Sequence, residues 1–348
     1  MPGRETEVLS ERALNRALLA RQFLLEPAAL PVPRLLERIG GIQAQYAPSM
    51  YIGLWSRLDN FGRDSLTTAL EQHAAVQATL LRITIHLVSA SDFWTFALAT
   101  RAARRALWLR ATPDAPSAAA MEGAAERLRV ALAGGATLRR KEIDALLGKP
   151  AARGVGVWVD LVRAPPSGTW ERRRADLYAL AEDWLAPVDI TPGDAAEHLV
   201  RRYLGAFGPA TVKDIVSFTG LPPTDLASTL ARLELRRFRS EDDQELLDVP
   251  RAPLPDPDTP APVRFIGTWD ASLLVHARRA GVLPEEHRPR IFHTKAPQSF
   301  PTFLVDGAVA GTWRYEQGAI DLTPFGRLDA ATRRGLAAEA GRLAALHA

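Results

Sequence analysis

The spacing of apolar residues predicts three helices in the N-terminal part of the chain. Residues 9–25 carry leucines at helical spacing, and Ser10 stands where it can cap the first turn. Prolines then interrupt the chain before a second, short helix at residues 32–39, and residues 49–58 form the third. Residues 80–89 instead alternate apolar and polar side chains, which is typical of a half-buried strand. This order of elements is that of a winged helix.

An internal repeat predicts two further modules of the same kind. Residues 141–148 (KEIDALLG) resemble residues 213–220 (KDIVSFTG), and each copy has the pattern of a short helix that ends in glycine. A predicted two-stranded hairpin follows each copy. Its strands are residues 155–162 and 169–174 in the first copy, and 235–239 and 245–249 in the second, after a helix at 224–233. We therefore expect winged-helix modules at residues 1–111, 119–190 and 191–250.

The C-terminal part has a different pattern. A proline-rich linker at residues 251–262 precedes a strand at 263–269, and the chain ends in an amphipathic helix at 329–346. Two β runs, residues 301–305 and 308–315, flank Asp306-Gly307, a strong signal for a type I′ hairpin turn. We expect residues 263–348 to form a region of strands with a hairpin and a closing helix.

Composition excludes several classes of protein. With 348 residues, 47% of them hydrophobic and 24% charged, the chain has ordinary globular values. Its apolar runs fall short of the ~20 residues that span a bilayer, and its first residues lack the apolar core of a signal peptide. Cysteine is absent, the histidines are scattered, and no glycine-rich phosphate loop occurs. We expect a cytoplasmic protein without a metal or cofactor.

Nearly all the positive charge is arginine, because lysine occurs only at Lys141, Lys149, Lys213 and Lys295. The planar guanidinium suits phosphate groups and base edges. A GC-rich coding sequence produces the same bias without any selection for binding. The charge balance therefore permits nucleic-acid binding but does not establish it.

Gln43 and Gln45 follow a Gly40-Gly41 break and precede Tyr46. Residues two apart point to opposite sides of a helix but to the same side of an extended segment. Because the two glycines end the preceding helix, we expect an extended segment that presents both amides together. The alternative is a pair of surface glutamines at a corner between two helices.

The chain resembles the AlkZ-like winged-helix DNA glycosylases in several motifs, one of which contains Gln43 and Gln45. The resemblance rests on LLERIGGIQAQY (35–46), LRITIHLVS (81–89), APPSGTWERR (164–173), and residues 269–284 and 288–314, which include the hairpin PTFLVDGAVAGTWR. It implies an α+β, helix-rich fold of three tandem winged-helix motifs around a concave DNA-binding cleft. It also implies a monofunctional glycosylase that excises N7-alkylated purines, including bulky adducts or interstrand crosslinks, and that can serve antibiotic self-resistance. Gln43 and Gln45 match the family's catalytic pair.

Several residues are candidates for DNA contact. Arg82, Thr84 and His86 would share one face of the predicted strand, and a solvated face is the alternative. Trp313 and Arg314 would anchor the predicted hairpin in a groove, although Trp313 alone favours the core. The phosphate-contact candidates are Arg288, Arg290, His293 and Lys295, which follow one another in a predicted loop. We expect a monomer whose partner is double-stranded DNA with alkylated purines, and no membrane.

Two other functions compete with the enzyme. A transcription regulator would use a winged helix to read base edges, but its recognition helix would then be polar. The candidate in the first module, residues 49–58, is apolar and predicted to be buried. A protein that sequesters adducts without turnover would keep the cleft and lack the chemistry. We favour the glycosylase.

Overall fold

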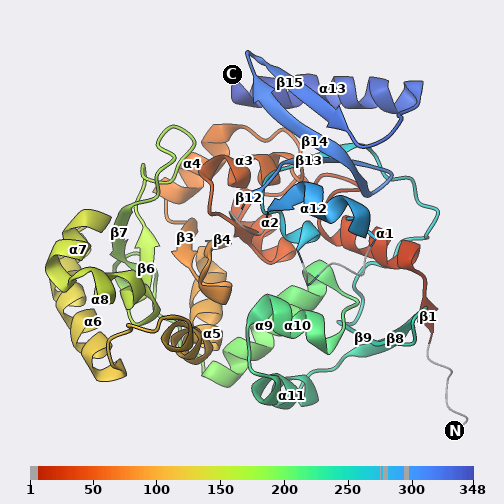
Figure 1. The fold of residues 1–348 in the computed structure, drawn as a ribbon. Coiled ribbons are helices and arrows are strands. Elements are labelled where there is room, and N and C mark those ends of the chain that lie inside the picture. Colours follow the sequence, from red (N-terminus) through yellow and green to blue (C-terminus); the bar gives the residue numbers. More distant parts are fainter. Residues whose placement is uncertain (1–6, 275, 277–280, 294–297) are drawn as a thin grey trace, which may run out of the picture.

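Capping residues begin and end the helices where the sequence predicts. In α1 (Glu11–Arg21) the Ser10 hydroxyl accepts a hydrogen bond from the Ala13 amide, and α2 (Val32–Ile39) ends at Gly40 with φ +76°. At the other end of the chain, Asp329 caps α13 (Ala330–His347). These elements are seen in a computed structural model that describes residues 7–274, 276, 281–293 and 298–348 (Figure 1). The fold is mixed α+β and rich in helix.

A six-stranded sheet spans the first two predicted modules. Its order is β2-β4-β3-β6-β7-β5, and β3 pairs with β6 through Ala78 and Val162. The strands are β2 (Ile42–Gln43), β3 (Ala75–Thr79), β4 (Ile85–Ser89), β5 (Leu138–Arg139), β6 (Leu161–Arg163) and β7 (Leu177–Leu180). The helices of this part are α3 (Ala47–Trp55), α4 (Arg63–Glu71), α5 (Ala90–Ala111), α6 (Ala118–Leu132), α7 (Arg140–Leu147) and α8 (Lys149–Gly154). Strand pairing therefore crosses the limit predicted between residues 111 and 119.

Both copies of the internal repeat form a short helix that ends at a glycine with positive φ, although ψ differs, at 147° for Gly148 and 10° for Gly220. Gly148 ends α7 with φ +77°, and Gly220 ends α10 (Val212–Thr219) with φ +71°. Helix α11 (Pro223–Ala231) and the antiparallel strands β8 (Arg236–Ser240) and β9 (Glu245–Asp248) then follow as predicted. The N-terminal strand β1 (Val8–Leu9) pairs with β8, so the start of the chain completes this sheet.

The predicted C-terminal hairpin is present. Asp306 and Gly307 have φ +46° and +83°, the two positive values that a type I′ turn requires. The hairpin belongs to a four-stranded sheet against which α13 packs. Its strands are β10 (Arg264–Ile266), β13 (Thr302–Val305), β14 (Ala308–Glu316) and β15 (Ala319–Pro324). The short elements before it are α12 (Arg288–Ile291), β11 (Phe292–His293) and β12 (Gln298–Ser299).

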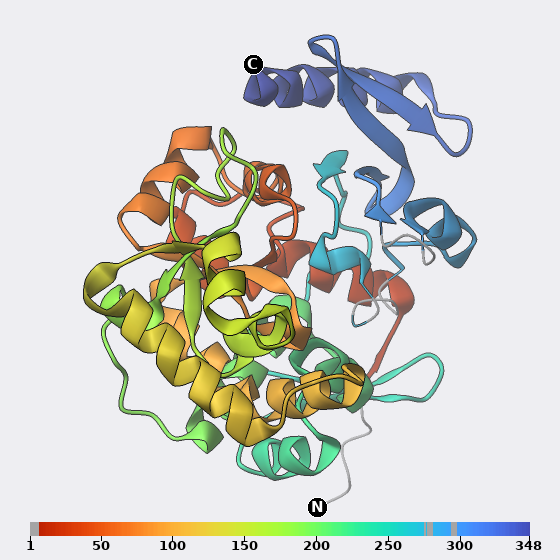
Figure 2. The ribbon, with the colours of Figure 1, turned by 60° about the vertical axis from the view of Figure 1, so that its left-hand side comes forward.

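Helix α9 (Pro192–Phe207) joins the parts of the molecule, because it packs against α1, α2, α5, α10 and α11. The rings of its Tyr203 and Phe207 contact the Phe218 ring of α10 beside Gly40, the residue that ends α2. The C-terminal sheet and α13 lie at one end of the molecule, and α9–α11 lie at the other (Figure 2). Among the described residues, no helix is long and apolar enough to cross a membrane.

The prediction of a strand at residues 80–89 is correct only for its second half. Only β4 (Ile85–Ser89) is a strand, whereas Leu81–Ile83 forms a short 3-10 turn. Arg82 and Ile83 adopt φ +53° and +59°, values that cost free energy in residues other than glycine. Contacts of the Arg82 guanidinium with distant parts of the chain account for this turn. Arg82 and His86 therefore do not share a strand face.

The strands predicted behind the first repeat are displaced. The first predicted strand, residues 155–162, begins as the 3-10 turn Val155–Val157, and β6 follows only at Leu161. A Cβ at Gly154 would lie 2.2 Å from the Trp108 ring, so only glycine fits directly before this turn. The second predicted strand, residues 169–174, is a loop, and the strand that returns is β7.

Candidate active site

A short extended segment carries the two glutamines, as the sequence predicts. Gly40 ends α2, and Gly41 lies so close to β4 that a Cβ there would come within 3.0 Å of the Leu87 carbonyl oxygen. Glycine lets β2 pair with β4, which places Gln43 opposite His86. The amide of Ala44 donates to the carbonyl of Ile85 over 2.7 Å, and α3 begins at Ala47.

The two amide side chains contact each other. Nε2 of Gln43 donates a hydrogen bond to Oε1 of Gln45. Gln43 is 7% exposed and therefore belongs to the protein interior, whereas Gln45 is exposed. Each amide oxygen has two lone pairs, so Oε1 of Gln45 keeps one for a further hydrogen bond. The segment thus presents one anchored amide and one amide that solvent can reach.

Arg82 holds the inner amide. Its Nη2 lies 3.4 Å from Oε1 of Gln43, and its Nη1 donates to the carbonyl of Phe218. The guanidinium lies 5.5 Å from the centre of the Phe218 ring. Burial lowers the pKa of Arg82 to about 10, so the group remains protonated at neutral pH. Arg82 thereby connects the glutamine segment to α10.

His86 is buried and neutral. Its Nδ1 lies 3.0 Å from the carbonyl oxygen of Thr84, an acceptor that requires a hydrogen on Nδ1. Burial, and then the positive charge of Arg82, lower the pKa of His86 to about 3. The imidazole therefore carries no charge at neutral pH, and it packs on the same side of the sheet as Gln43.

Stability is expected to fall in acid because of His86. The unfolded chain binds a proton near pH 6.5, whereas the folded protein excludes it from His86 down to about pH 3. The free energy of unfolding therefore decreases as pH falls through this window, by about 2 kcal/mol per group between pH 6.5 and 5. The free energy of unfolding is measured with denaturant at pH 6.5 and pH 5. Its decrease between these pH values should be about 2 kcal/mol smaller in His86→Gln than in the intact protein. An equal loss in both proteins would contradict the buried neutral His86.

The segment at residues 164–173 also reaches the glutamines. Nη1 of Arg173 donates to the hydroxyl of Tyr46 over 3.1 Å, directly after Gln45 in the chain. The side chains of Arg63 and Arg173 both lie near the Trp170 ring, at 5.3 and 5.8 Å. The run Arg172–Arg174 is exposed on this segment. No role was predicted for these arginines, and their signal in the sequence is three consecutive arginines behind a glycine turn.

The residues of the predicted phosphate-contact loop do not all face solvent. The side chain of Arg288 lies partly buried, with Nη1 3.3 Å from the Leu273 carbonyl oxygen and Nε 3.4 Å from Glu285. Arg290 is exposed and stacks 3.7 Å from the centre of the Phe325 ring, and His293 is exposed on β11. Lys295 lies outside the described residues. Of the predicted phosphate-contact residues that the structure describes, Arg290 and His293 are therefore the exposed ones.

Trp313 is a core residue. It is 5% exposed, and its indole Nε1 donates to the carbonyls of Ile266 and Thr302, each over 3.1 Å. The core position that the sequence favoured for Trp313 is the one observed, and this ring does not face a groove. Arg314, the next residue, is exposed and pairs with Glu316 and Asp321 at 2.8 and 2.9 Å.

Comparison with known proteins identifies a family and a similar solved structure. A family model described as "DNA glycosylase AlkZ-like" matches residues 36–346. The structure of the DNA glycosylase AlkZ of Streptomyces sahachiroi is similar, with a TM-score of 0.81 over 97% of both chains and a sequence identity of 19%. No curated protein sequence matches the chain.

Proposed function

Because the chain belongs to the AlkZ-like family of DNA glycosylases, we propose that it excises N7-alkylated, cationic purines from double-stranded DNA through Gln43 and Gln45. The observation that carries this proposal is the direct contact between the two amides in one extended segment. The proposed reaction is hydrolysis of the N-glycosidic bond, which leaves an intact abasic strand. The chain acts as a monomer in this proposal.

Two amides suit a leaving group that is already charged. Glutamine does not titrate near neutral pH and is therefore a poor general acid or base. A purine alkylated at N7 carries a positive charge and departs without a proton donor. The protein must then orient a water molecule and stabilise an oxocarbenium-like sugar, which dipoles at fixed positions can do. The remaining lone pair of Gln45 Oε1 can accept a hydrogen from that water.

Arg82 is proposed to position this pair. Its hydrogen bond to Gln43 fixes the oxygen of that amide, so that the amide nitrogen is directed at Gln45. The donors then run in one direction, from Arg82 through Gln43 to Gln45, and hydrogen bonds in such a chain polarise one another. Neutral His86 packs beside Gln43 without adding a second positive charge near the cationic base.

The exposed Gln45 supports action on bulky lesions. A base that is crosslinked to the opposite strand cannot rotate freely into a closed pocket. An amide that solvent can reach is compatible with a lesion that stays stacked in the duplex. Bulky adducts and interstrand crosslinks are therefore included among the proposed substrates, and their removal would protect a cell that produces a DNA-alkylating antibiotic.

We also propose that the helix, glycine, helix and hairpin units act as winged-helix modules. The proposed limits are residues 1–111, 119–190 and 191–250, followed by the C-terminal region at 263–348. Their concave side would hold the duplex. The exposed side chains that we propose for phosphate contact are Arg172, Arg173, Arg174, Arg290, His293 and Arg314. Lys295 remains a candidate from the sequence alone.

The proposal is tested by comparing release of a cationic base with release of neutral bases. Base release is measured from matched duplexes that carry one N7-methylguanine, one unmodified guanine or one uracil. We expect release of the cationic base to be about 10²–10⁴-fold faster, because a neutral base requires the proton donor that two amides do not provide. The strand should remain uncut until alkali cleaves the abasic site. Equal release of cationic and neutral bases would contradict the mechanism.

A further inference from the structure

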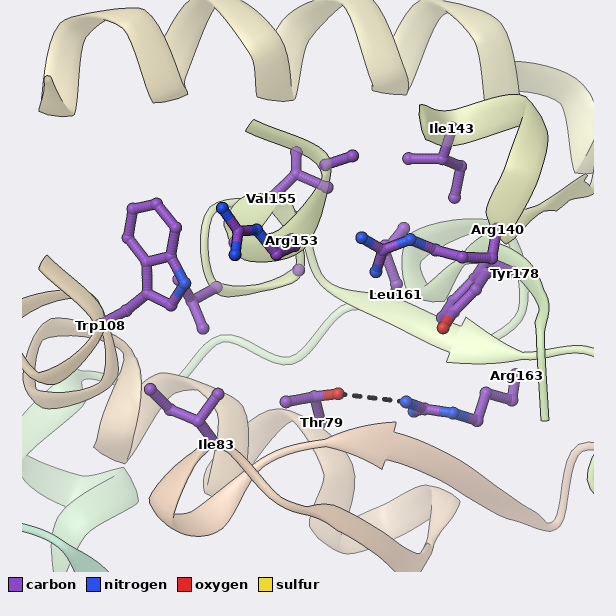
Figure 3. A pocket seen from close by; sticks show the side chains of 14 residues that line it. Thr79, Ile83, Trp108, Arg140, Ile143, Arg153, Val155, Leu161, Arg163 and Tyr178 are labelled. Atoms are coloured by element: carbon purple, nitrogen blue, oxygen red, sulfur yellow. Dashed lines mark hydrogen bonds between the residues drawn. The ribbon is translucent and has the colours of Figure 1, made fainter. Parts of the chain in front are cut away.

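A cavity of about 120 Å³ lies between α5 and the α7–α8 pair, and neither Gln43 nor Gln45 lines it. Apolar and aromatic side chains form much of its wall, among them Trp108, Ile83, Leu161 and Tyr178 (Figure 3). Its volume is close to that of an engineered cavity of about 150 Å³ that binds one benzene ring. The space is therefore large enough for a small ligand.

Three arginines line the same cavity from different elements. Arg140 comes from α7, Arg153 from α8 and Arg163 from β6, and Figure 3 shows their guanidinium groups around one space. Arg140 is paired with Asp144 over 2.8 Å. Among the described residues, neither Arg153 nor Arg163 forms an ion pair with a carboxylate, and no acidic residue lines the cavity. The cavity thus has an excess of positive charge.

Arg163 is the most unusual member of this group. It is 6% exposed, its Nη2 donates to the hydroxyl of Thr79 over 3.3 Å, and its Nε has no hydrogen-bond partner among the described residues. Burial lowers the pKa of Arg163, and the electrostatic interaction and side-chain hydrogen bond with Tyr178 offset only part of that effect. A buried charge without a counter-charge costs free energy. An anion in the cavity would supply both the charge and the acceptor atoms.

We propose that this cavity is a binding site for an oxyanion of the phosphate class. Arg163 would bind it from the interior, and the exposed Arg153 would close over it from the mouth of the cavity. Guanidinium groups bind phosphate oxygens through paired hydrogen bonds, and Trp108 and Ile83 would pack against any apolar group attached to the anion. The anion has two possible sources, a free phosphate compound or a phosphodiester of the DNA.

The first experiment uses free anions. Thermal unfolding is followed with increasing inorganic phosphate or phenyl phosphate, and the ionic strength is kept constant with chloride. We expect a saturable rise in Tm, because a ligand that binds only the folded state stabilises it. Arg153→Gln should weaken the apparent affinity at least about tenfold, since it removes one charged partner of the anion. Arg127→Gln, which removes an exposed arginine of α6, should leave the affinity unchanged.

The second experiment identifies the DNA as the source, and it alone depends on the proposed function. Binding to undamaged duplex is measured against salt concentration. If the phosphodiester is the ligand, Arg153→Gln reduces the slope of log affinity against log salt by about one, and Arg127→Gln does not. Either result supports the site. The proposal is overturned if neither free anion stabilises the protein through Arg153 and the salt slope of Arg153→Gln equals that of the intact protein.

Discussion

Gln45→Ala is expected to slow release of N7-methylguanine by about 10²–10³-fold, the loss typical of one positioned dipole in an active site. The side chain of Gln45 is exposed, so its truncation should leave folding and DNA affinity unchanged. Single-turnover base release at saturating enzyme gives the rate of the chemical step. Gln72→Ala, another exposed glutamine at the end of α4, serves as the matched control and should retain full activity.

Gln43→Ala should reduce the same rate to a similar extent but for a second reason. It removes the donor to Gln45 and leaves the Arg82 guanidinium without its amide partner. Because the two amides act as one unit, the double variant should be little slower than either single variant. Fully multiplicative losses would show that the two glutamines act independently and would contradict the proposed pair.

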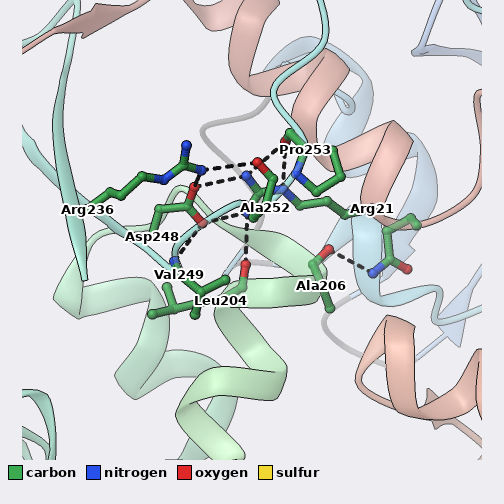
Figure 4. Close-up of polar contacts among 9 residues, drawn as sticks. Arg21, Leu204, Ala206, Arg236, Asp248, Val249, Ala252 and Pro253 are labelled. Atoms are coloured by element: carbon green, nitrogen blue, oxygen red, sulfur yellow. Dashed lines mark hydrogen bonds and ion pairs between the residues drawn. The ribbon is translucent and has the colours of Figure 1, made fainter. Parts of the chain in front are cut away.

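Asp248→Asn is expected to lower the free energy of unfolding by about 3–5 kcal/mol, the cost of breaking a buried ion pair. Asp248 and the Arg21 side chain are both 0% exposed, and Oδ1 and Oδ2 of Asp248 lie 2.7 and 3.0 Å from Nη1 and Nη2 of Arg21. Asp248 also pairs with Arg236 and accepts from the Val249 amide (Figure 4). The substitution would leave the Arg21 guanidinium buried without a full counter-charge.

The hairpin of β8 and β9, which contains Asp248, also supplies a control residue for this prediction. Asp243 pairs with Arg239 in the exposed turn before β9, so Asp243→Asn should change stability by less than about 1 kcal/mol. Asparagine also tolerates the positive φ of residue 243. Equilibrium unfolding in urea compares both variants with the intact protein. A loss under about 1 kcal/mol for Asp248→Asn would show that the pair adds little to the fold.

The Arg21–Asp248 ion pair is connected through neighbouring residues to the segment that carries Gln43 and Gln45. Gln22, next to Arg21, donates to the carbonyl of Ala206 over 3.0 Å and to that of Ile39 over 3.3 Å. Ile39 is the last residue of α2, directly before Gly40 and Gly41. The network therefore holds α2 and α9 together at the point where the extended segment begins.

Local signals in the sequence predicted the parts of the fold that depend on local chemistry. The type I′ turn at Asp306-Gly307 and the extended segment after Gly40-Gly41 both follow from positive φ angles that glycine permits. The predicted cap Ser10 placed the start of α1 correctly. These features needed no knowledge of distant contacts.

Features that depend on distant contacts were missed. Strand β3, with the sequence AVQAT, is buried along most of its length and therefore lacks the alternation that identifies a strand. The turn at Arg82 and Ile83 depends on contacts with Gln43 and with Phe218, which is 136 positions away from Arg82. The sequence pattern could not indicate these interactions, because they exist only in the folded chain.

The most direct test of the account is base release by the intact protein from a duplex that carries one N7-alkylguanine. The released base is identified by mass spectrometry, and binding to undamaged DNA of many sequences is measured in parallel. We expect release of the alkylated base from a strand that stays intact, together with weak, sequence-independent binding to undamaged DNA. No release from methylated or bulky adducts, together with tight binding to one undamaged sequence, would contradict it and would favour a transcription regulator.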